Sequence, residues 1–173
     1  MGWQLNDNIG KINFKTEKFS LDSSVVIAFF NSYLEFILRE IFKNKIVFSS
    51  EIFKEIKRYD LNSLSYQILS AKTIEESEYF YKISSSNLSL SIADVHLITV
   101  CKFNNLVCVS FEKKIRKVCR EENIENIGLL HILKEAIRLK LINKQEAKNM
   151  VFRLRNDGLY LTEESYNKIL EEI

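Results

Sequence analysis

The segment LSIADVHLITVCKFNNLVCVSFEKKIRKV, residues 90–118, contains a predicted helix, a strand and a second helix in direct succession. Apolar residues recur at helical spacing from Ser91 to Phe103, which predicts a helix rich in apolar side chains. Leu106 to Val109 is a continuous apolar run, which is typical of a central strand in a parallel sheet. Glu112 to Glu122 is predicted to form the next helix. Because parallel neighbours need helical crossovers, this succession indicates an α/β fold.

The alternation of strands and helices extends through the rest of the chain. Strands are predicted at Lys18–Leu21, at Ile46–Phe48, at Tyr79–Ile83 and, at one edge, at Ile124–Ile127. Helices are predicted at Ser23–Phe30, Tyr33–Phe42, Asn62–Glu76, Leu129–Leu139, Lys144–Arg155 and Glu163–Glu172, and from Ser49 or Ser50 through Glu55 to about Arg58. The polar stretch before Lys18 is expected to add an edge hairpin, Ser84–Leu90 to form a connection, and Thr162 to cap the last helix.

The length of 173 residues suits one domain with a small addition. We expect a main domain at residues 1–142 and a C-terminal helical extension at residues 143–173, packed on that domain. The chain has no proline and four glycines, and the phosphate-binding patterns GxxxxGK and GxGxxG are absent. Nucleotide-hydrolysing P-loop proteins and Rossmann dehydrogenases are therefore excluded.

The three cysteines are odd in number and lie in apolar segments, which favours reduced packing residues over a disulfide framework or a zinc site: Cys101, Cys108 and Cys119. Two histidines are too few for a His-rich metal site. The net charge of +2 permits RNA binding without requiring it. No signal peptide is expected from the polar residues near the N-terminus, and no apolar run reaches the roughly 20 residues of a membrane span. A cytoplasmic protein without a membrane partner is the expectation.

Four acidic residues lie where a predicted strand ends or on a predicted helix: Asp22, Glu55, Asp94 and Glu112. Ligands in parallel α/β folds bind beyond the carboxyl ends of the strands, and the fold can carry these side chains to that edge. Carboxylate oxygens are the ligands that Mg²⁺ prefers. The set therefore predicts a site for a divalent metal ion, Mg²⁺ or Mn²⁺.

Each acid also has an ordinary structural explanation. Asp22 precedes a helix and can cap it, while Asp94 stands three residues after Ser91 in the spacing of a capping box. Glu55 and Glu112 lie on helices that also carry lysine and arginine, so local ion pairs are their usual role. Only the ordered set of four favours a metal site.

Four basic residues fall on one side of the helix that follows Glu112: Lys113, Arg116, Lys117 and Arg120. They can hold RNA phosphates in a salt-sensitive way, or they can form the solvated face of an amphipathic helix. The aromatic run at residues 79–81 can stack on bases, although aromatic residues in an apolar segment more often belong to the core.

Three segments together resemble the PIN-domain ribonucleases in order and spacing: FSLDSSVVIAFF (residues 19–30), IVFSSEIFKEI (46–56) and the segment at 90–118. The closing residues 128–170 are similar to a prokaryotic, VapC-like branch with a C-terminal helical extension. The resemblance implies a three-layer α/β/α sandwich with a central, mostly parallel sheet. It also implies cleavage of RNA with Mg²⁺ or Mn²⁺, a role as the toxin of a toxin–antitoxin pair, a small antitoxin partner and a homodimer.

The resemblance also assigns roles to the acids. Asp22 and Asp94 match direct metal ligands, Glu112 a further ligand, and Glu55 a ligand or a base that orients water. The fourth motif differs from the family pattern of Thr or Ser, Asp or Asn, then Asp, because it reads Ser110, Phe111, Glu112. Ser110 matches a supporting hydroxyl, whereas Glu112 carries one extra methylene. Two alternatives follow: a metal-dependent endoribonuclease, or a catalytically weakened module that binds RNA or protein.

Overall fold

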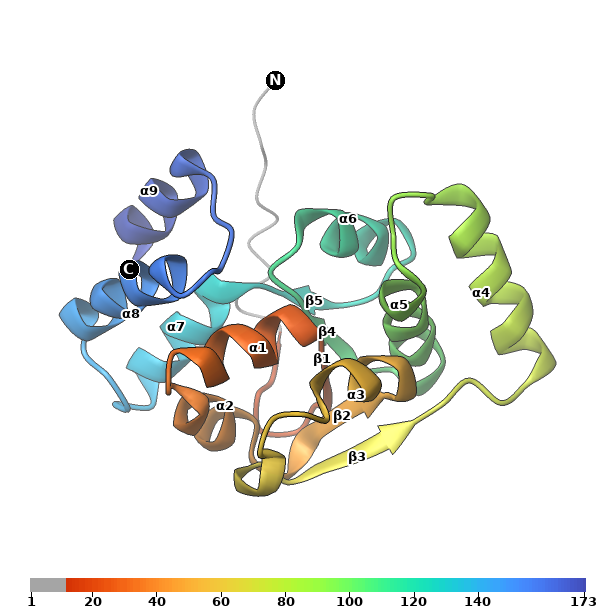
Figure 1. The fold of residues 1–173 in the computed structure, drawn as a ribbon, viewed down its shortest axis with the longest axis horizontal. Helices are drawn as coiled ribbons and strands as arrows, with labels where there is room; N and C mark the ends of the chain where they lie inside the picture. Colours follow the sequence, from red (N-terminus) through yellow and green to blue (C-terminus); the bar gives the residue numbers. More distant parts are fainter. Residues whose placement is uncertain (1–11) are drawn as a thin grey trace.

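Five parallel strands form the centre of the computed structural model, which describes residues 12–173 (Figure 1). Their spatial order is β3-β2-β1-β4-β5, and every neighbouring pair is parallel. The strands are β1 (Phe19–Leu21), β2 (Ile46–Ser49), β3 (Tyr66–Leu69), β4 (Val107–Val109) and β5 (Asn126–Ile127). Helices cover the sheet, so the predicted three-layer α/β/α sandwich with a parallel sheet is confirmed.

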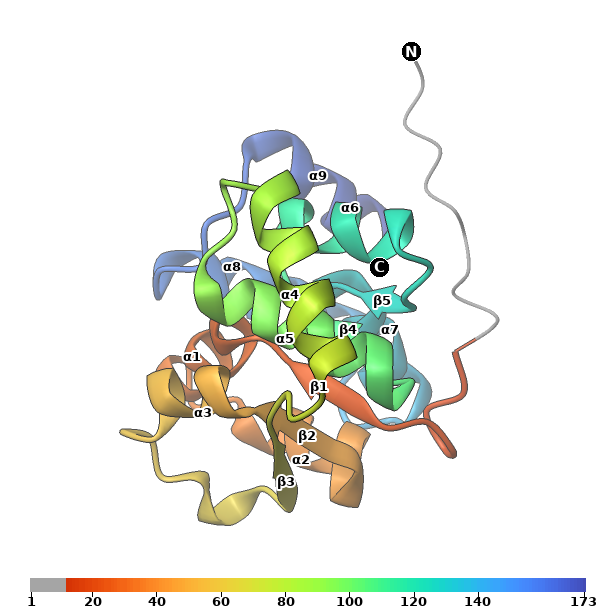
Figure 2. The same ribbon diagram turned by 90° about the vertical axis from the view of Figure 1, so that its right-hand side faces the viewer.

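Nine α-helices connect or follow the strands in the described part of the chain: α1 (Ser23–Asn31), α2 (Glu35–Phe42), α3 (Ser50–Ile56), α4 (Ile74–Ser86), α5 (Ile92–Asn104), α6 (Lys113–Glu121), α7 (Leu129–Arg138), α8 (Lys144–Asn156) and α9 (Glu163–Glu172). Helix α5 packs against β1, β2 and β4, with α4 and α6 beside it (Figure 2). Helices α1, α2, α3 and α7 contact one another in the pairs α1–α2, α1–α3 and α2–α7. Helix α3 contacts both α1 and α5, so it lies between these two helices.

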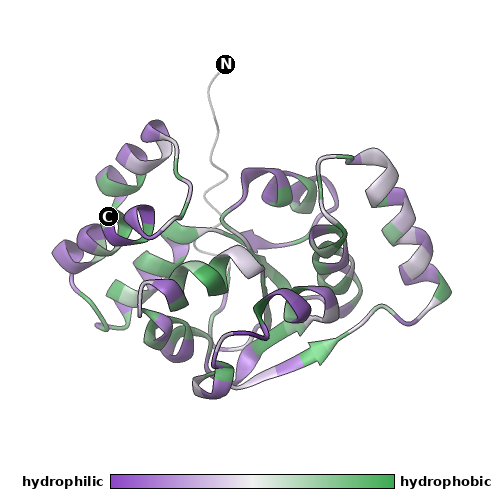
Figure 3. Ribbon diagram, in the orientation of Figure 1, coloured by the Kyte–Doolittle hydropathy of each residue, from purple (hydrophilic) through white to green (hydrophobic). Residues whose placement is uncertain are grey.

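Strand β1 lies in the middle of the sheet, where it pairs with β2 on one edge and with β4 on the other. All of its side chains are buried. Its register sets Phe19 opposite Val107 and Leu21 opposite Val109. The ring of Phe19 packs on Phe42 at a centroid distance of 4.9 Å and on Phe14 at 5.2 Å. Figure 3 shows the same pattern, with apolar residues concentrated on the central strands and polar residues on the outer helices.

The two elements predicted between residues 62 and 83 are wrong. The predicted helix Asn62–Glu76 is replaced by a 3₁₀ turn, by β3 and by the beginning of α4. The predicted strand Tyr79–Ile83 lies inside α4, which extends to Ser86. Strand β3 is an edge strand with only partly buried side chains, so its apolar pattern is weak. In α4 the aromatic run is spread around the helix, and Tyr81 is exposed.

A capping box begins α4. The carboxylate of Glu76 accepts hydrogen bonds from the backbone N–H of Lys72 at 2.6 Å and of Thr73 at 2.8 Å. In return, the Thr73 hydroxyl accepts from the N–H of Glu76 at 3.1 Å. The two backbone hydrogen bonds hold the pKa of Glu76 below its usual value. The ionised carboxylate therefore stabilises the first turn of α4.

Glu76→Ala is expected to lower the free energy of unfolding at pH 7 by about 1–2 kcal/mol, because it removes the cap. Since the pKa of Glu76 is lowered in the fold, its stabilising effect is present above the ordinary pKa and is lost as the pH falls through the folded pKa. Urea unfolding at pH 7 and at pH 3.5 should therefore show a smaller difference between variant and wild type at the lower pH. Glu75→Ala, one residue away and exposed, is the matched control and should show no such pH-dependent difference.

Helices α8 and α9 follow the sheet and lie at the end of the molecule opposite α4 (Figure 1). The Ser32 hydroxyl, just after α1, donates to the Asp157 carboxylate at 2.7 Å, and Lys134 on α7 pairs with Glu172 at 3.3 Å. Thr162 caps α9 through its hydroxyl, as predicted. The division into residues 1–142 and 143–173 stays a prediction.

Two further expectations concern the ends of the sheet and the cysteines. The edge hairpin expected before Lys18 falls mostly on residues 1–11, which lie outside the described residues, and residues 12–18 form no strand. All three cysteines are free and buried in the core. Among residues 12–173, none of the helices combines the length and the apolar character that crossing a membrane requires.

Candidate metal centre

The carboxyl end of β1 places Asp22 between two neighbouring segments. The backbone N–H of Asp22 donates to the carbonyl of Val109 on β4 at 2.9 Å, which continues the ladder one residue past the strand. The side chain is 1% exposed, and its Oδ2 accepts from the hydroxyls of Ser24 at 2.6 Å and Ser110 at 2.8 Å. Asp22 occupies the cap position of α1, but its carboxylate makes no capping hydrogen bond. Capping alone therefore does not explain this buried acid.

Asp94 is held at the beginning of α5 by a capping box. Its Oδ2 accepts from the N–H of Ser91 at 2.8 Å, and the Ser91 hydroxyl accepts from the N–H of Asp94 at 3.1 Å. The capping explanation for Asp94 is thus correct as far as it goes. The same Oδ2 also lies 3.3 Å from the ammonium of Lys114 on α6, so the carboxylate has a second, electrostatic contact.

The motif after β4 divides its three side chains between the site and the core. The Ser110 hydroxyl donates to Asp22 and accepts from the N–H of Glu112 at 3.1 Å. The Phe111 ring packs toward Phe29 on α1 at a centroid distance of 6.2 Å. Glu112 stands at the cap position of α6 without a capping hydrogen bond. Ser110 thus joins the end of β1 to the beginning of α6.

Asp22, Asp94 and Glu112 share one electrostatic environment, which we call the acidic rim. Burial raises the pKa of Asp22, and the hydrogen bonds from Ser24 and Ser110 oppose that rise. The negative charges of Asp94 and Glu112 raise the pKa of Asp22 further. A cation placed among these three carboxylates would lower the pKa of Asp22, because a positive charge favours the ionised form of a carboxyl group.

One cation of the chain already contacts the acidic rim. The ammonium of Lys114 lies 3.3 Å from Asp94 Oδ2 and 3.2 Å from Glu112 Oε2, and it donates to the carbonyl of Ser89 at 3.1 Å. Burial lowers the pKa of Lys114, but the contacts with Glu112 and Asp94 outweigh burial and raise that pKa above its usual value. The sequence pattern did not single out Lys114, because it is one of several basic residues in the same helix.

Glu55 is the predicted acid that the structure does not connect to the others. It is exposed in the last turn of α3, and its carboxylate makes no hydrogen bond or ion pair with any residue of the described part of the chain. Its proposed role as a ligand or as a base stays a prediction.

The four basic residues predicted to bind RNA differ in their surroundings. Lys113, Lys117 and Arg120 are exposed, and Lys117 forms only a loose ion pair with Glu121 at 3.7 Å. The guanidinium of Arg116 instead points inward and donates to the carbonyl of Ser110 at 2.6 Å. A Cβ at Gly128 would lie 3.3 Å from that guanidinium carbon. The absence of a side chain at Gly128 therefore leaves room for the Arg116 guanidinium. Arg116 therefore supports the backbone of the Ser110 motif.

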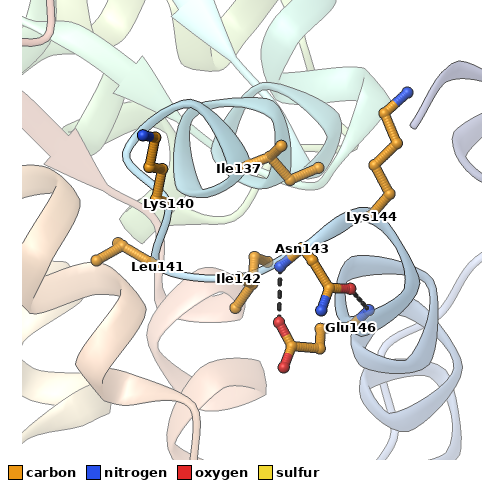
Figure 4. A pocket seen from close by; sticks show the side chains of 7 residues that line it. All are labelled: Ile137, Lys140, Leu141, Ile142, Asn143, Lys144 and Glu146. Atoms are coloured by element: carbon orange, nitrogen blue, oxygen red, sulfur yellow. Dashed lines mark hydrogen bonds between the residues drawn. The ribbon is translucent and has the colours of Figure 1, made fainter.

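One surface hollow lies away from the acidic rim. It is formed where α7 joins α8, around a capping box in which Asn143 and Glu146 exchange hydrogen bonds (Figure 4). Its lining residues are Ile137, Lys140, Leu141, Ile142, Asn143, Lys144 and Glu146. None of the predicted site residues lines this hollow.

The donor set of the acidic rim suits a hard divalent ion, because it consists of carboxylate oxygens supported by hydroxyls. As they stand, residues 12–173 contain no group of three or more His, Cys, Asp or Glu side chains disposed to hold a metal ion. The Oδ2 of Asp22 accepts from two hydroxyls, while Asp94 and Glu112 contact Lys114. A metal ion at Asp94 and Glu112 would compete with Lys114.

A family model described as a PIN domain matches residues 19–173, which include every strand and helix described above. No curated protein was found that matches the chain significantly.

Proposed function

Because the chain belongs to the PIN-domain family, whose members are generally nucleases, we propose that it is a metal-dependent endoribonuclease that hydrolyses RNA phosphodiester bonds. The observation that carries this proposal is the acidic rim at the carboxyl end of the sheet. Asp22 is buried there, and the negative charges of Asp94 and Glu112 contribute to raising its pKa. Ligand sites in parallel α/β folds occupy this edge.

In the proposed site, Asp22, Asp94 and Glu112 hold Mg²⁺ or Mn²⁺. When bound, such an ion polarises the phosphodiester and lowers the pKa of a water molecule. Ser24 and Ser110 fix the orientation of Asp22, since both hydroxyls donate to its Oδ2. Arg116 holds the carbonyl of Ser110 and thereby keeps that hydroxyl in place. Glu55 is proposed as a further ligand or as a base that orients the attacking water.

The proposal is tested by incubating the protein with a mixed-sequence single-stranded RNA in Mn²⁺, in Mg²⁺ and in EDTA. Internal cleavage that requires the metal ion supports an endoribonuclease. Shortening of the RNA from one end only would contradict the endonuclease assignment, and cleavage in EDTA would contradict metal dependence.

We propose that the exposed cations of α6 hold the RNA backbone beside the acidic rim. Replacing Lys113, Lys117 and Arg120 together by glutamine is expected to weaken RNA binding and to reduce the slope of log K against log salt by about 2, since each phosphate contact to a single strand contributes roughly 0.7. Fluorescence anisotropy over a salt series in EDTA measures both quantities.

A variant of equal charge change serves as the control for this surface. Replacing Lys144, Lys148 and Lys168 by glutamine removes three exposed cations from α8 and α9. If that variant loses as much RNA affinity as the α6 variant, net charge rather than the α6 surface determines binding.

The alternative function is a catalytically weakened module that binds RNA or protein. Two observations favour it: Phe111 directs an aromatic ring toward the core where the family pattern has Asp or Asn, and Lys114 bridges Asp94 and Glu112. RNA binding without cleavage, in a protein that still binds Mn²⁺, would support this alternative.

We also propose that the protein acts as the toxin of a toxin–antitoxin pair and forms a homodimer. Membership of the PIN-domain family supports both proposals. The partner would be a small antitoxin that covers the acidic rim, and such a protein would inhibit the RNA cleavage described above.

A further inference from the structure

The ammonium of Lys114 contacts three oxygen atoms, two of them in the acidic rim, although its side chain is 41% exposed. Its ammonium lies 3.3 Å from Asp94 Oδ2, 3.2 Å from Glu112 Oε2 and 3.1 Å from the carbonyl oxygen of Ser89. Three acceptors satisfy the three donors of an ammonium group. The three contacts come from two separate segments: Ser89 and Asp94 lie before and within the first turn of α5, and Glu112 stands at the cap position of α6.

The neighbouring basic residues do not share this position. Lys113 is exposed and forms no ion pair with any described residue, and Arg116 is turned toward the carbonyl of Ser110. Lys114 is thus the cation that neutralises Asp94 and Glu112. Asp22, in contrast, receives only hydroxyl hydrogen bonds and no ion pair among residues 12–173.

We infer that Lys114 is an intramolecular counterion of the acidic rim that a divalent metal ion must displace, so that Lys114 sets the metal affinity of the site. This inference rests on the proposed function, because it takes the acidic rim as the metal site. A divalent ion and the ammonium of Lys114 repel each other when both contact Asp94 and Glu112. Metal binding therefore weakens the Lys114 contacts, and these contacts weaken metal binding.

The charges of the site show that Lys114 lowers its affinity for a divalent metal ion. Three carboxylates supply three negative charges, and Lys114 reduces their net charge to minus two. A divalent ion gains less from binding to such a site than to three unpaired carboxylates, and it must also break the Lys114 contacts. Occupancy of the site then requires a higher concentration of free metal ion than the three acids alone would require.

The test is a titration with Mn²⁺ alone, by isothermal calorimetry, of the wild type and of three full-length variants. Lys114→Met removes the ammonium and keeps a side chain of similar length, and we expect it to bind Mn²⁺ on the order of tenfold more tightly, the size of one charge interaction with a divalent ion at contact in water. Lys114→Arg keeps the charge and should stay near the wild type. Lys113→Met removes the adjacent charge and should also bind Mn²⁺ like the wild type.

A second measurement uses the wild type and does not depend on the folding of a variant. Mass spectrometry after limited acetylation should show greater modification of Lys114 with saturating Mn²⁺ than in EDTA, while the modification of Lys113 should not change. An equal Mn²⁺ affinity in Lys114→Met and wild type, together with an unchanged reactivity of Lys114, would overturn the inference and leave the proposed function standing. Absence of Mn²⁺ binding in all four proteins would overturn the inference and also the metal centre of the proposed function.

Discussion

Asp22→Asn is expected to reduce metal-dependent RNA cleavage by roughly a thousandfold or more, because a metal ion contributes several kcal/mol to catalysis and each ~1.4 kcal/mol corresponds to a factor of ten. Asp22 is the most deeply buried acid of the acidic rim, and two hydroxyls aim its carboxylate. An amide in its place keeps the shape but loses the charge. Single-turnover cleavage of a labelled RNA in Mn²⁺ measures the effect.

The same substitution is not expected to destabilise the fold. Since the pKa of Asp22 is raised in the folded protein, its ionisation costs stability as the pH rises through that pKa. In EDTA at pH 7, Asp22→Asn should therefore unfold at a urea concentration equal to or higher than the wild type. Asp60→Asn, at an exposed acid outside the rim, is the matched control for cleavage. Full activity in Asp22→Asn would exclude Asp22 from the catalytic site.

Phe19→Ala is expected to lower the free energy of unfolding by about 3–5 kcal/mol, the usual range for a fully buried phenylalanine. Phe19 has no exposed surface, and its ring contacts Phe14 and Phe42 at one end of the central strand. A loss of this size is a large fraction of the about 5–15 kcal/mol that stabilises a typical domain. Urea unfolding should show a lower midpoint with an unchanged slope.

An exposed aromatic residue serves as the control for this prediction. Tyr160 is 86% exposed, so Tyr160→Ala should change the free energy of unfolding by no more than about 0.5 kcal/mol. A comparable loss in both variants would show that the measured effect does not come from the core beneath β1.

The fold could be predicted where strands are buried on both faces. The apolar runs of β1, β2 and β4 stand out from their surroundings, and polar or turn residues mark their ends. Strand β3 could not be recognised in this way, because it lies at the edge and two of its four residues are exposed. The strand predicted at Tyr79–Ile83 was wrong because aromatic side chains are frequent in strands but also occur in amphipathic helices. The capping box of Thr73 and Glu76 was the signal that a helix begins there.

The candidate site could be predicted only as far as the backbone determines it. Asp22, Asp94 and Glu112 stand at the ends of elements, so the topology alone brings them to one edge. Lysine and arginine side chains are long and flexible, and their direction depends on neighbours that are distant in sequence. Residue spacing could not predict two contacts for this reason: that of Arg116 with the carbonyl of Ser110 and that of Lys114 with Asp94.

The hydrogen bond between Asp22 and Ser110 joins residues that are 88 positions apart. At about 5–20 residues per second, roughly 4–18 s of synthesis separate the two on the ribosome. Strand β1 also remains without one of its two neighbours until β4 has been made. The acidic rim is thus assembled late in translation, because a chain interrupted before residue 107 contains Asp22 and Asp94 but lacks both β4 and Glu112.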